Sequence, residues 1–257
     1  MIWVMSGTKD GRNLINRLAD KGYKMVITTA TQYGSSLIPQ TGNMKIITQR
    51  LTAEQMELVI AEHDIKILVD ATHPYATSAS QNAILACKSM SIKYVRYERP
   101  SILEGRKFNQ SPKLKRFPDV KKAAQWLKNK KGNILLTTGS KNLEEFTQVI
   151  ERKRLYIRVL PSQGVIGKCE MLGFNSSQII AMEGPFTQQM NQQIYKHFAI
   201  QHMVTKDSGD VGGTNEKLTG AILEGVTPII IDRPKINYPN ISSKLDDVLE
   251  YVEKYYS

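Results

Sequence analysis

Short apolar runs alternate with longer amphipathic stretches along the whole chain of 257 residues. Strands buried inside a parallel sheet read as brief apolar runs, and the helices that cover such a sheet read as amphipathic stretches. The alternation therefore predicts an α/β protein with parallel sheets covered by helices. The chain is long enough for two domains of ordinary size. We expect two Rossmann-like domains whose parallel sheets face each other across a cleft.

The predicted elements fall into two series separated by a stretch without periodicity. The first series has strands at 2–5, 25–29, 44–48, 65–70 and 94–97, with helices at 11–21, 53–63 and 76–89. The second has strands at 133–137, 156–160, 178–182, 202–205 and 228–231, with helices at 120–129, 142–151, 188–198, 214–223 and 243–255. Pro, Lys, Arg and Gly accumulate between the two series. The predicted organisation is a first domain at 1–100, a linker at 101–118 and a second domain at 119–257.

The charge of the chain favours an anionic partner. Lys and Arg number 35 against 24 Asp and Glu, which gives a formal net charge of +11. The basic residues are scattered over predicted helices and form no nucleic-acid-binding module, so we expect no nucleic-acid partner. Their densest groups, within 106–116 and 121–131, are interpreted as a solvated linker and a solvated helix face.

Other features of the composition exclude several classes of protein. The chain has no apolar window of about 18 residues and no basic leader, so we expect a soluble cytoplasmic protein without a membrane partner. Cys87 and Cys169 are far apart and belong to no Cys/His cluster. We therefore expect no disulfide and no metal site.

A glycine-containing loop follows the first predicted strand. Residues 6–12 read Ser-Gly-Thr-Lys-Asp-Gly-Arg and lead into a helix, where backbone amides can approach a pyrophosphate. The candidate cofactor-binding residues of this loop are Gly7, Thr8, Gly11 and Arg12. The alternative is a tight turn that needs glycine only for its dihedral angles.

The end of the second predicted strand bears on the choice of dinucleotide. An acidic residue usually stands there and holds the ribose 2′-OH, but this segment has no carboxylate. Thr29 and Thr31 stand at the strand end, and their hydroxyls can bond a 2′-phosphate. This favours NADPH as the cofactor, with NADH as the alternative.

The segment Asp-Ala-Thr-His-Pro-Tyr-Ala at 70–76 follows the fourth predicted strand and precedes a helix. Pro74 fixes its own φ and biases His73 towards an extended backbone, so the turn is short and stiff. Ligands of an open parallel sheet bind at the carboxyl ends of its strands. Asp70, Thr72 and His73 are therefore candidate cofactor contacts. The alternative is that Asp70 or Thr72 caps the next helix.

The second domain has a polar loop after its fourth predicted strand. Residues 205–213 read Thr-Lys-Asp-Ser-Gly-Asp-Val-Gly-Gly. Lys206 and Ser208 can bind a carboxylate or a phosphate, and Asp207 can orient Lys206 or carry a proton. Glycines such as Gly213 let the backbone approach a ligand. The alternative is a flexible turn with a surface Lys–Asp pair.

A further polar loop, Thr-Thr-Gly-Ser-Lys-Asn at 137–142, opens a helix of the second domain. Ser140 and Lys141 are candidate anion-binding residues there. Simple capping of the helix by Ser140 is the alternative.

Together these blocks resemble the precorrin-6A reductases of cobalamin biosynthesis. The matching blocks are residues 6–8 with Arg12, 70–76, 97–100, 137–141, 183–186 and 205–209. The resemblance runs along essentially the whole chain, and its most specific parts are the blocks at 70–76 and 205–209. The first loop departs from the family, which more often has Gly-Gly-Thr followed by Glu-Ala-Arg. This chain keeps a small residue, a carboxylate and the arginine at those places.

The resemblance implies a reductase that moves a hydride from a reduced nicotinamide to one double bond of a ring-contracted, methylated tetrapyrrole, with or without cobalt. The acetate and propionate groups of such a substrate suit the positive charge of the chain. Arg99 and Arg233 are suited to bind carboxylates at two points, beside the loop residues at 140–141 and 206–213. The candidate proton donors are Asp207, Lys206, His73 and Tyr75, or a water that they hold.

Other functions stay open on the sequence. A non-catalytic NAD(P)-binding sensor would keep the loop at Gly7 without needing the dense polar segment at 205–213. A different NAD(P)-dependent reductase with an anionic substrate is also compatible, although the Tyr-x-x-x-Lys pair of short-chain reductases is absent from the helices of the first domain. The chain is expected to act as a monomer or a homodimer.

Overall fold

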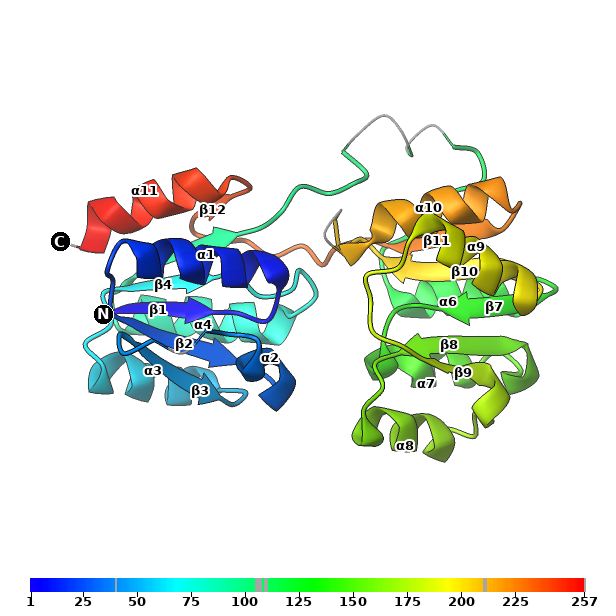
Figure 1. Ribbon diagram of the computed structural model, residues 1–257, viewed down its shortest axis with the longest axis horizontal. Coiled ribbons are helices and arrows are strands. Elements are labelled where there is room, and N and C mark those ends of the chain that lie inside the picture. The colour runs from blue at the N-terminus through cyan, green and yellow to red at the C-terminus, as the bar shows by residue number, and fades with distance from the viewer. Residues whose placement is uncertain (40, 105–107, 109–110, 210–211, 257) are drawn as a thin grey trace. The chain divides into compact units, whose positions relative to one another are not determined.

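The computed structural model describes residues 1–39, 41–104, 108, 111–209 and 212–256. The chain forms two compact units (Figure 1). Unit 1 consists of Met1–Pro100 together with Lys235–Ser257, and unit 2 consists of Ser101–Pro234. Each unit is built on one parallel sheet of six strands with helices on both faces. The sequence predicted the parallel sheets and their covering helices, with five strands in each series.

The sheet of unit 1 has the strand order β12-β5-β4-β1-β2-β3. Its strands are β1 (Ile2–Met5), β2 (Met25–Thr29), β3 (Met44–Thr48), β4 (Ile67–Asp70), β5 (Lys93–Tyr97) and β12 (Ile241–Ser242). The order reverses between β1 and β4, which are direct neighbours in the sheet. Such a reversal opens a crevice at the carboxyl ends of the two strands, and that is where open α/β sheets bind ligands.

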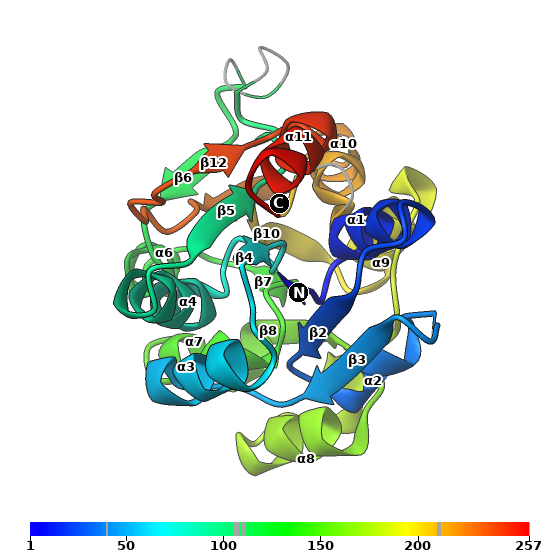
Figure 2. The same cartoon turned by 90° about the vertical axis from the view of Figure 1, so that its left-hand side faces the viewer.

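Helices cover both faces of this sheet (Figure 2). They are α1 (Lys9–Asp20), α2 (Gln32–Ser36), α3 (Ala53–Glu62), α4 (Thr77–Ser89) and α11 (Leu245–Tyr256). On one face, Leu14 of α1 and Val248 of α11 share an apolar core with the strands. On the other face, Met56 of α3 and Ala83 of α4 share a second core with Trp3. The two cores fix the positions of the strand ends that carry the candidate site.

Unit 2 repeats this arrangement with the strand order β6-β11-β10-β7-β8-β9. Its strands are β6 (Lys115–Phe117), β7 (Asn133–Leu136), β8 (Leu155–Val159), β9 (Ile179–Ala181), β10 (Ile200–Lys206) and β11 (Thr227–Ile231). The order reverses between β7 and β10, so the loops after these two strands flank the second switch point.

The helices of unit 2 are α6 (Val120–Lys128), α7 (Leu143–Thr147), α8 (Gln163–Met171), α9 (Gln188–His197) and α10 (Thr214–Leu223), with short 3₁₀ turns η1 (Ser140–Asn142), η2 (Arg152–Arg154) and η3 (Ser176–Gln178). Tyr195 of α9 and Leu218 of α10 pack with Leu135 and Met203 in one buried core. The helices α9 and α10 therefore cover the same face of the sheet. No helix in the described ranges has both the length and the apolar character needed to cross a membrane.

The domain boundaries differ from the sequence expectation at two places. The segment after Pro234 was expected in the second domain, but it returns to unit 1, where Ile241 of β12 pairs with Arg96 of β5. The expected linker contains β6, whose Lys115 pairs with Ile229 of β11. Residues 105–107 and 109–110 of that linker lie outside the described residues. Both strands are too short and too polar to give an apolar run, so their pairing is decided by the open sheet edges beside them.

Candidate functional site

The loop between β1 and α1 begins the candidate site of unit 1. Thr8 caps α1, because its hydroxyl oxygen accepts a hydrogen bond from the Gly11 amide (3.0 Å). The same hydroxyl donates to the Ala71 carbonyl (3.2 Å). A Cβ at Gly11 would fall 2.5 Å from Ser6 Oγ and 3.2 Å from the Ala71 oxygen. Gly11 is therefore needed for the close approach of α1 to the loop after β4.

Gly7 leaves open space at the amino end of α1. Its φ is +152°, and a Cβ built on it would meet no described atom within 4 Å outside Gly7 and its two chain neighbours. The neighbouring Ser6 Oγ is buried and has no hydrogen-bond partner among the described residues. A phosphate in this space would accept hydrogen bonds from Ser6 and from the unpaired amides in the first turn of α1. The loop thus fits the pyrophosphate of a dinucleotide.

Two threonines shape the end of β2. The Thr29 hydroxyl donates to the Thr31 carbonyl (3.2 Å), and the Thr31 hydroxyl oxygen caps α2 by accepting from the Gly34 amide (3.0 Å). Thr29 is buried and Thr31 is exposed. Residues 30–33 contain no carboxylate that would repel a phosphate near Thr31.

Asp70, the last residue of β4, is the centre of a buried polar network. Its Oδ1 accepts from the Thr72 amide (3.0 Å), the Thr72 hydroxyl (2.7 Å) and Arg96 Nη1 (2.7 Å). Its Oδ2 accepts from the Ser80 hydroxyl (2.6 Å) and the Tyr94 hydroxyl (2.9 Å). The network joins β4, β5 and α4, and both oxygens of Asp70 are occupied by it.

The network keeps Asp70 ionised. Burial alone would raise the pKa of Asp70, but the Arg96 guanidinium and the hydrogen bonds from Ser80 and Thr72 hold the pKa below its ordinary value. The carboxylate is fully buried. The expected contact between Asp70 and a cofactor stays a prediction. Within the structure, Asp70 fixes the direction in which Thr72 leaves the sheet.

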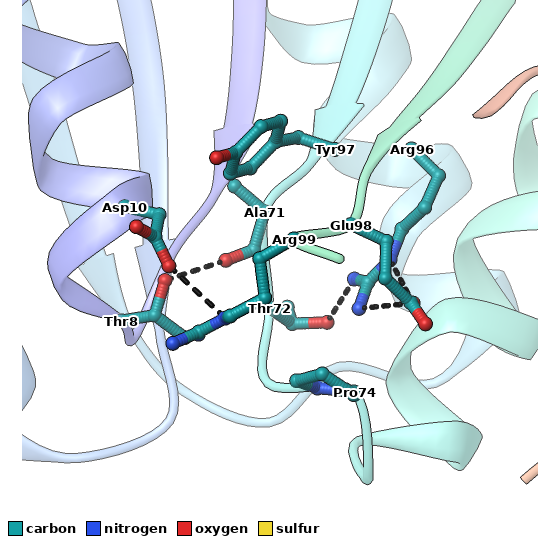
Figure 3. Close-up of a pocket in the computed structure, with 9 residues that line it drawn as sticks. All are labelled: Thr8, Asp10, Ala71, Thr72, Pro74, Arg96, Tyr97, Glu98 and Arg99. Atoms are coloured by element: carbon teal, nitrogen blue, oxygen red, sulfur yellow. Dashed lines mark hydrogen bonds and ion pairs between the residues drawn. The ribbon is translucent and has the colours of Figure 1, made fainter. Parts of the chain in front are cut away.

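A small pocket opens at this edge of the sheet (Figure 3). It is lined by Thr8, Asp10, Ala71, Thr72, Pro74, Arg96, Tyr97, Glu98 and Arg99. Figure 3 shows two guanidinium groups that are each held by a carboxylate. Arg96 Nε donates to Glu98 Oε2 (3.0 Å), and Arg99 Nε pairs with Asp10 Oδ2 (3.1 Å). Arg99 therefore anchors the first turn of α1, and its expected binding of a substrate carboxylate stays a prediction.

His73 and Tyr75 lie half-buried on the turn after β4. The Tyr75 amide donates to His73 Nδ1 (3.3 Å), and the two ring centroids are 5.6 Å apart. The Ala76 amide closes the turn by donating to the His73 carbonyl (2.8 Å). Because Nδ1 accepts a hydrogen bond, Nε2 carries the proton in the neutral ring and can donate it.

Lys206 ends β10 in unit 2. Its ammonium donates to Asn142 Oδ1 (3.2 Å) on the loop after β7. Burial lowers the pKa of Lys206, and the positive charge of Lys141 lowers that pKa further. The structure thus brings Lys206 and Lys141 together from the two loops that flank the switch point of unit 2.

Asp207 follows Lys206 in the sequence, and its side chain is buried. Its Oδ2 accepts from the Ser101 hydroxyl (2.5 Å) and lies 3.3 Å from Arg233 Nε. Arg233 Nε also donates to the Asp207 carbonyl (3.0 Å), and the Gly209 amide donates to Oδ1 (3.3 Å). Asp207 therefore fastens the residues by which the chain enters and leaves unit 2. These contacts suit Asp207 to the positioning of Ser101 and Arg233 better than to proton transfer. They also give the Arg233 guanidinium a carboxylate within the chain.

The remaining predicted residues of unit 2 lie on the same two loops. The Ser208 amide donates to Thr214 Oγ1 (3.3 Å), and Gly213 has a φ of +65° where α10 begins. Ser140 and Lys141 form η1 after β7. Residues 210–211 of the predicted loop lie outside the described residues. Groups of three or more His, Cys, Asp or Glu side chains that could hold a metal ion are absent from the described ranges.

The chain matches a known protein family over almost its full length. The family is described as precorrin-6x reductase CbiJ/CobK, and the match covers residues 1–253. The chain belongs to this family. It is thus a member of a family of oxidoreductases. The loops described above lie at the two switch points of its sheets.

Relatives of similar length support the same assignment. The chain is 37% identical to the cobalt-precorrin-6A reductase of Priestia megaterium, over 97% of this chain and 96% of that protein. It is 34% identical to the cobalt-precorrin-6A reductase of Methanococcus maripaludis, over 98% of each chain. The solved structure of CobK precorrin-6A reductase has the same fold, with a TM-score of 0.80, 23% identity and coverage of 99% of this chain and 96% of that chain.

The sequence did not predict the residues that hydrogen-bond to Asp70. Arg96 and Tyr94 lie on β5, and Ser80 lies on α4. A signal was present, because Arg96 interrupts the short strand Lys-Tyr-Val-Arg-Tyr, and an arginine inside a buried strand needs an acidic partner. The partner itself follows only from the pairing of β5 with β4.

Proposed function

We propose that the protein reduces one double bond of precorrin-6A or cobalt-precorrin-6A in cobalamin biosynthesis, with NADPH as the hydride donor. The observation that carries the proposal is the family match over residues 1–253, joined to a dinucleotide-type loop at the switch point of unit 1. The alternatives are a non-catalytic NAD(P)-binding sensor and a different NAD(P)-dependent reductase with an anionic substrate.

Unit 1 is the proposed cofactor domain. When bound, the nicotinamide supplies the hydride. The open space at Gly7 and the unpartnered Ser6 Oγ suit the pyrophosphate, while Thr8 and Gly11 hold the first turn of α1 against the loop after β4. Arg12 follows in the next turn of that helix. The proposed role of these residues is to bind and orient the dinucleotide.

The preference for NADPH over NADH rests on the end of β2. Thr31 is exposed there and no carboxylate stands within residues 30–33. A 2′-phosphate meets hydroxyl donors at this place, whereas the ribose 2′-OH of NADH finds no carboxylate to accept its hydrogen bond.

Unit 2 is the proposed macrocycle-binding domain. The formal charge of +11 attracts a polycarboxylate, and Lys206 with Lys141 concentrates part of that charge at the switch point. Ser140, Ser208 and Gly213 lie on the same two loops and are proposed to complete the contacts.

The reduction also needs a proton at the carbon next to the one that accepts the hydride. Among the candidates, Lys206 suits this role best, because it stands at the strand end and burial lowers its pKa below the ordinary value. Asp207 is already held by Ser101 and Arg233. His73 and Tyr75 are the other candidates.

The test is direct. Purified protein is mixed with NADPH and enzymatically prepared precorrin-6A, with and without cobalt, and both NADPH oxidation and the mass of the product are followed. The expected product is the dihydro macrocycle, with more rapid turnover by NADPH than by NADH. Cofactor binding without turnover of either macrocycle would favour the sensor, and turnover of another substrate class would favour a different reductase.

A further inference from the structure

Arg158 is a buried arginine in unit 2, and no acidic side chain among the described residues pairs with it. It lies on β8, one residue before the strand ends, and is 5% exposed. Its Nη1 donates to Asn191 Oδ1 on α9 (2.8 Å), and the Phe186 ring lies over the guanidinium with its centroid 4.0 Å away. Its Nη2 is buried and has no hydrogen-bond partner among the described residues.

A second cation is buried near Arg158. Lys217 of α10 is 9% exposed, and its ammonium donates to the Gly212 carbonyl (3.2 Å) and the Thr205 hydroxyl (3.5 Å). Burial and the charge of Arg158 lower the pKa of Lys217 to about 7, although Glu216 acts in the opposite direction. The two cations are therefore close enough to repel each other inside the protein.

Such a pair costs free energy. A buried charge is disfavoured unless a counter-charge and hydrogen bonds compensate it, and two buried like charges add repulsion to that cost. Asn191 and Phe186 compensate Arg158 only in part, because neither carries a negative charge. An anion that accepts from Nη2 would remove most of the penalty and would gain charge-assisted hydrogen bonds.

The position of the pair fits a ligand site. Leu136 of β7 pairs with Ile157 of β8 and with Val204 of β10, so Arg158 and Thr205 lie one residue further towards the carboxyl edge. Their contacts with Asn191 and Lys217 place both side chains on the face covered by α9 and α10. The Lys206 ammonium donates to Asn142, which lies on the loop after β7 on the other side of the switch point.

The Phe186 ring, which covers one side of the Arg158 guanidinium, lies near the surface of unit 2. Phe186 is half-buried, and residues 182–185 before it are exposed. This aromatic ring belongs to the loop between β9 and α9, which carries no regular structure. Displacement of this loop would expose the guanidinium without a change in the pairing of β8 with β7 and β9.

We propose that Arg158, with Lys217 beside it, binds a peripheral carboxylate of the macrocycle. The inference rests on the proposed function for the identity of that anion, and it adds a buried subsite to the contacts at Lys206. A macrocyclic carboxylate is favoured over a cofactor phosphate, because the phosphate-type loop with open space lies in unit 1 and Arg158 lies in unit 2.

The test replaces Arg158 by Met, which keeps the length of the side chain and removes the charge. The KM for the macrocycle is expected to rise about tenfold or more, as the loss of a well-formed charged hydrogen bond requires, while the Kd for NADPH stays unchanged. R158K is expected to recover part of the loss. R116M is the matched control, because Arg116 is an exposed arginine of the same unit.

A readout independent of activity separates this inference from the proposed function. Binding of a porphyrin with acetate and propionate groups, and of its methyl ester, is measured by fluorescence quenching on the wild type and R158M. The acid is expected to bind the wild type more tightly than R158M, and the ester is expected to bind both equally. A failure to reduce precorrin-6A would then reject the proposed function while this difference still holds.

Three results would overturn the inference. The first is an unchanged macrocycle KM in a folded R158M. The second is an equal loss in R116M, which would mean that overall charge is responsible. The third is a weaker NADPH affinity in R158M, which would assign the anion to the cofactor. Circular dichroism and thermal melting establish that the variants are folded, and R158M is expected to melt no lower than the wild type because it removes an uncompensated buried charge.

Discussion

Asp70 and Arg96 are direct partners across β4 and β5, and both side chains are completely buried. Their ion pair is 2.7 Å long. Two charges at adjacent strand ends are compatible with such burial only because Thr72, Ser80 and Tyr94 complete the hydrogen bonding around them. The pair therefore fixes the geometry of the strand end from which the loop at 71–76 departs.

Removal of Asp70 should destabilise the protein strongly. D70A leaves Arg96 as a buried charge with a weaker set of partners, so we expect a loss of about 3–5 kcal/mol in the free energy of unfolding. Urea unfolding followed by circular dichroism measures the loss. D246A is the control, because Asp246 forms an exposed ion pair with Arg17 and its removal should cost no more than about 1 kcal/mol. Equal losses in the two variants would contradict the structural role of Asp70.

Substitution of Gly7 should separate cofactor binding from folding. G7V places a branched side chain in the open space at the amino end of α1, so we expect the Kd for NADPH to rise about tenfold or more. The φ of Gly7 adds backbone strain of about 1–3 kcal/mol. G22V is a matched control, because Gly22 also has a positive φ and no described atom within 4 Å of its Cβ position, but it follows the other end of α1.

Isothermal titration with NADPH distinguishes the two glycine variants. Both should lose similar stability, and only G7V should lose affinity. If G7V binds NADPH as tightly as G22V does, the loop after β1 is not the pyrophosphate site.

Much of the fold was predictable because most strands are buried on both faces. The strands β1, β2 and β3 were expected at the residues where they occur, since each reads as an apolar run between polar segments. The missed elements lack that signal. Helix α2 reads Gln-Tyr-Gly-Ser-Ser, and β12 has only two residues, whose pairing depends on the free edge of β5.

The sequence predicted the position of the candidate site better than it predicted the roles of the residues there. The order of residues places Gly7 and Asp70 at strand ends, and the parallel sheet brings these ends together. The role of Asp70 depends on Arg96, which is 26 positions away and becomes its partner only through strand register. The sequence alone also does not reveal that Asp207 is held by Ser101, which is 106 positions away.

Lys206 should control the dependence of turnover on pH. An ammonium that donates the proton must be charged, so the wild-type kcat should fall as pH rises through the lowered pKa of Lys206. K206M should reduce kcat about a hundredfold or more and abolish that alkaline decrease. K128M removes a lysine of α6 and serves as the control. A K206M enzyme that keeps both the rate and the alkaline decrease would transfer the role to His73 or Tyr75.

Lys217 should make the stability of the protein depend on pH above neutrality. Its pKa is about 7 in the folded protein, against an ordinary value of 10.5, so the unfolded chain holds more protons between these values. Stability contributed by this residue therefore rises with pH across that window, by an amount on the order of a few kcal/mol. The K217M variant has no ammonium at this position, so its stability lacks this dependence on pH. The difference in unfolding free energy between K217M and the wild type, measured in urea at a series of pH values, should favour K217M near pH 7 and shrink towards pH 10.5. A difference that stays constant with pH would show that Lys217 is not buried as a cation beside Arg158.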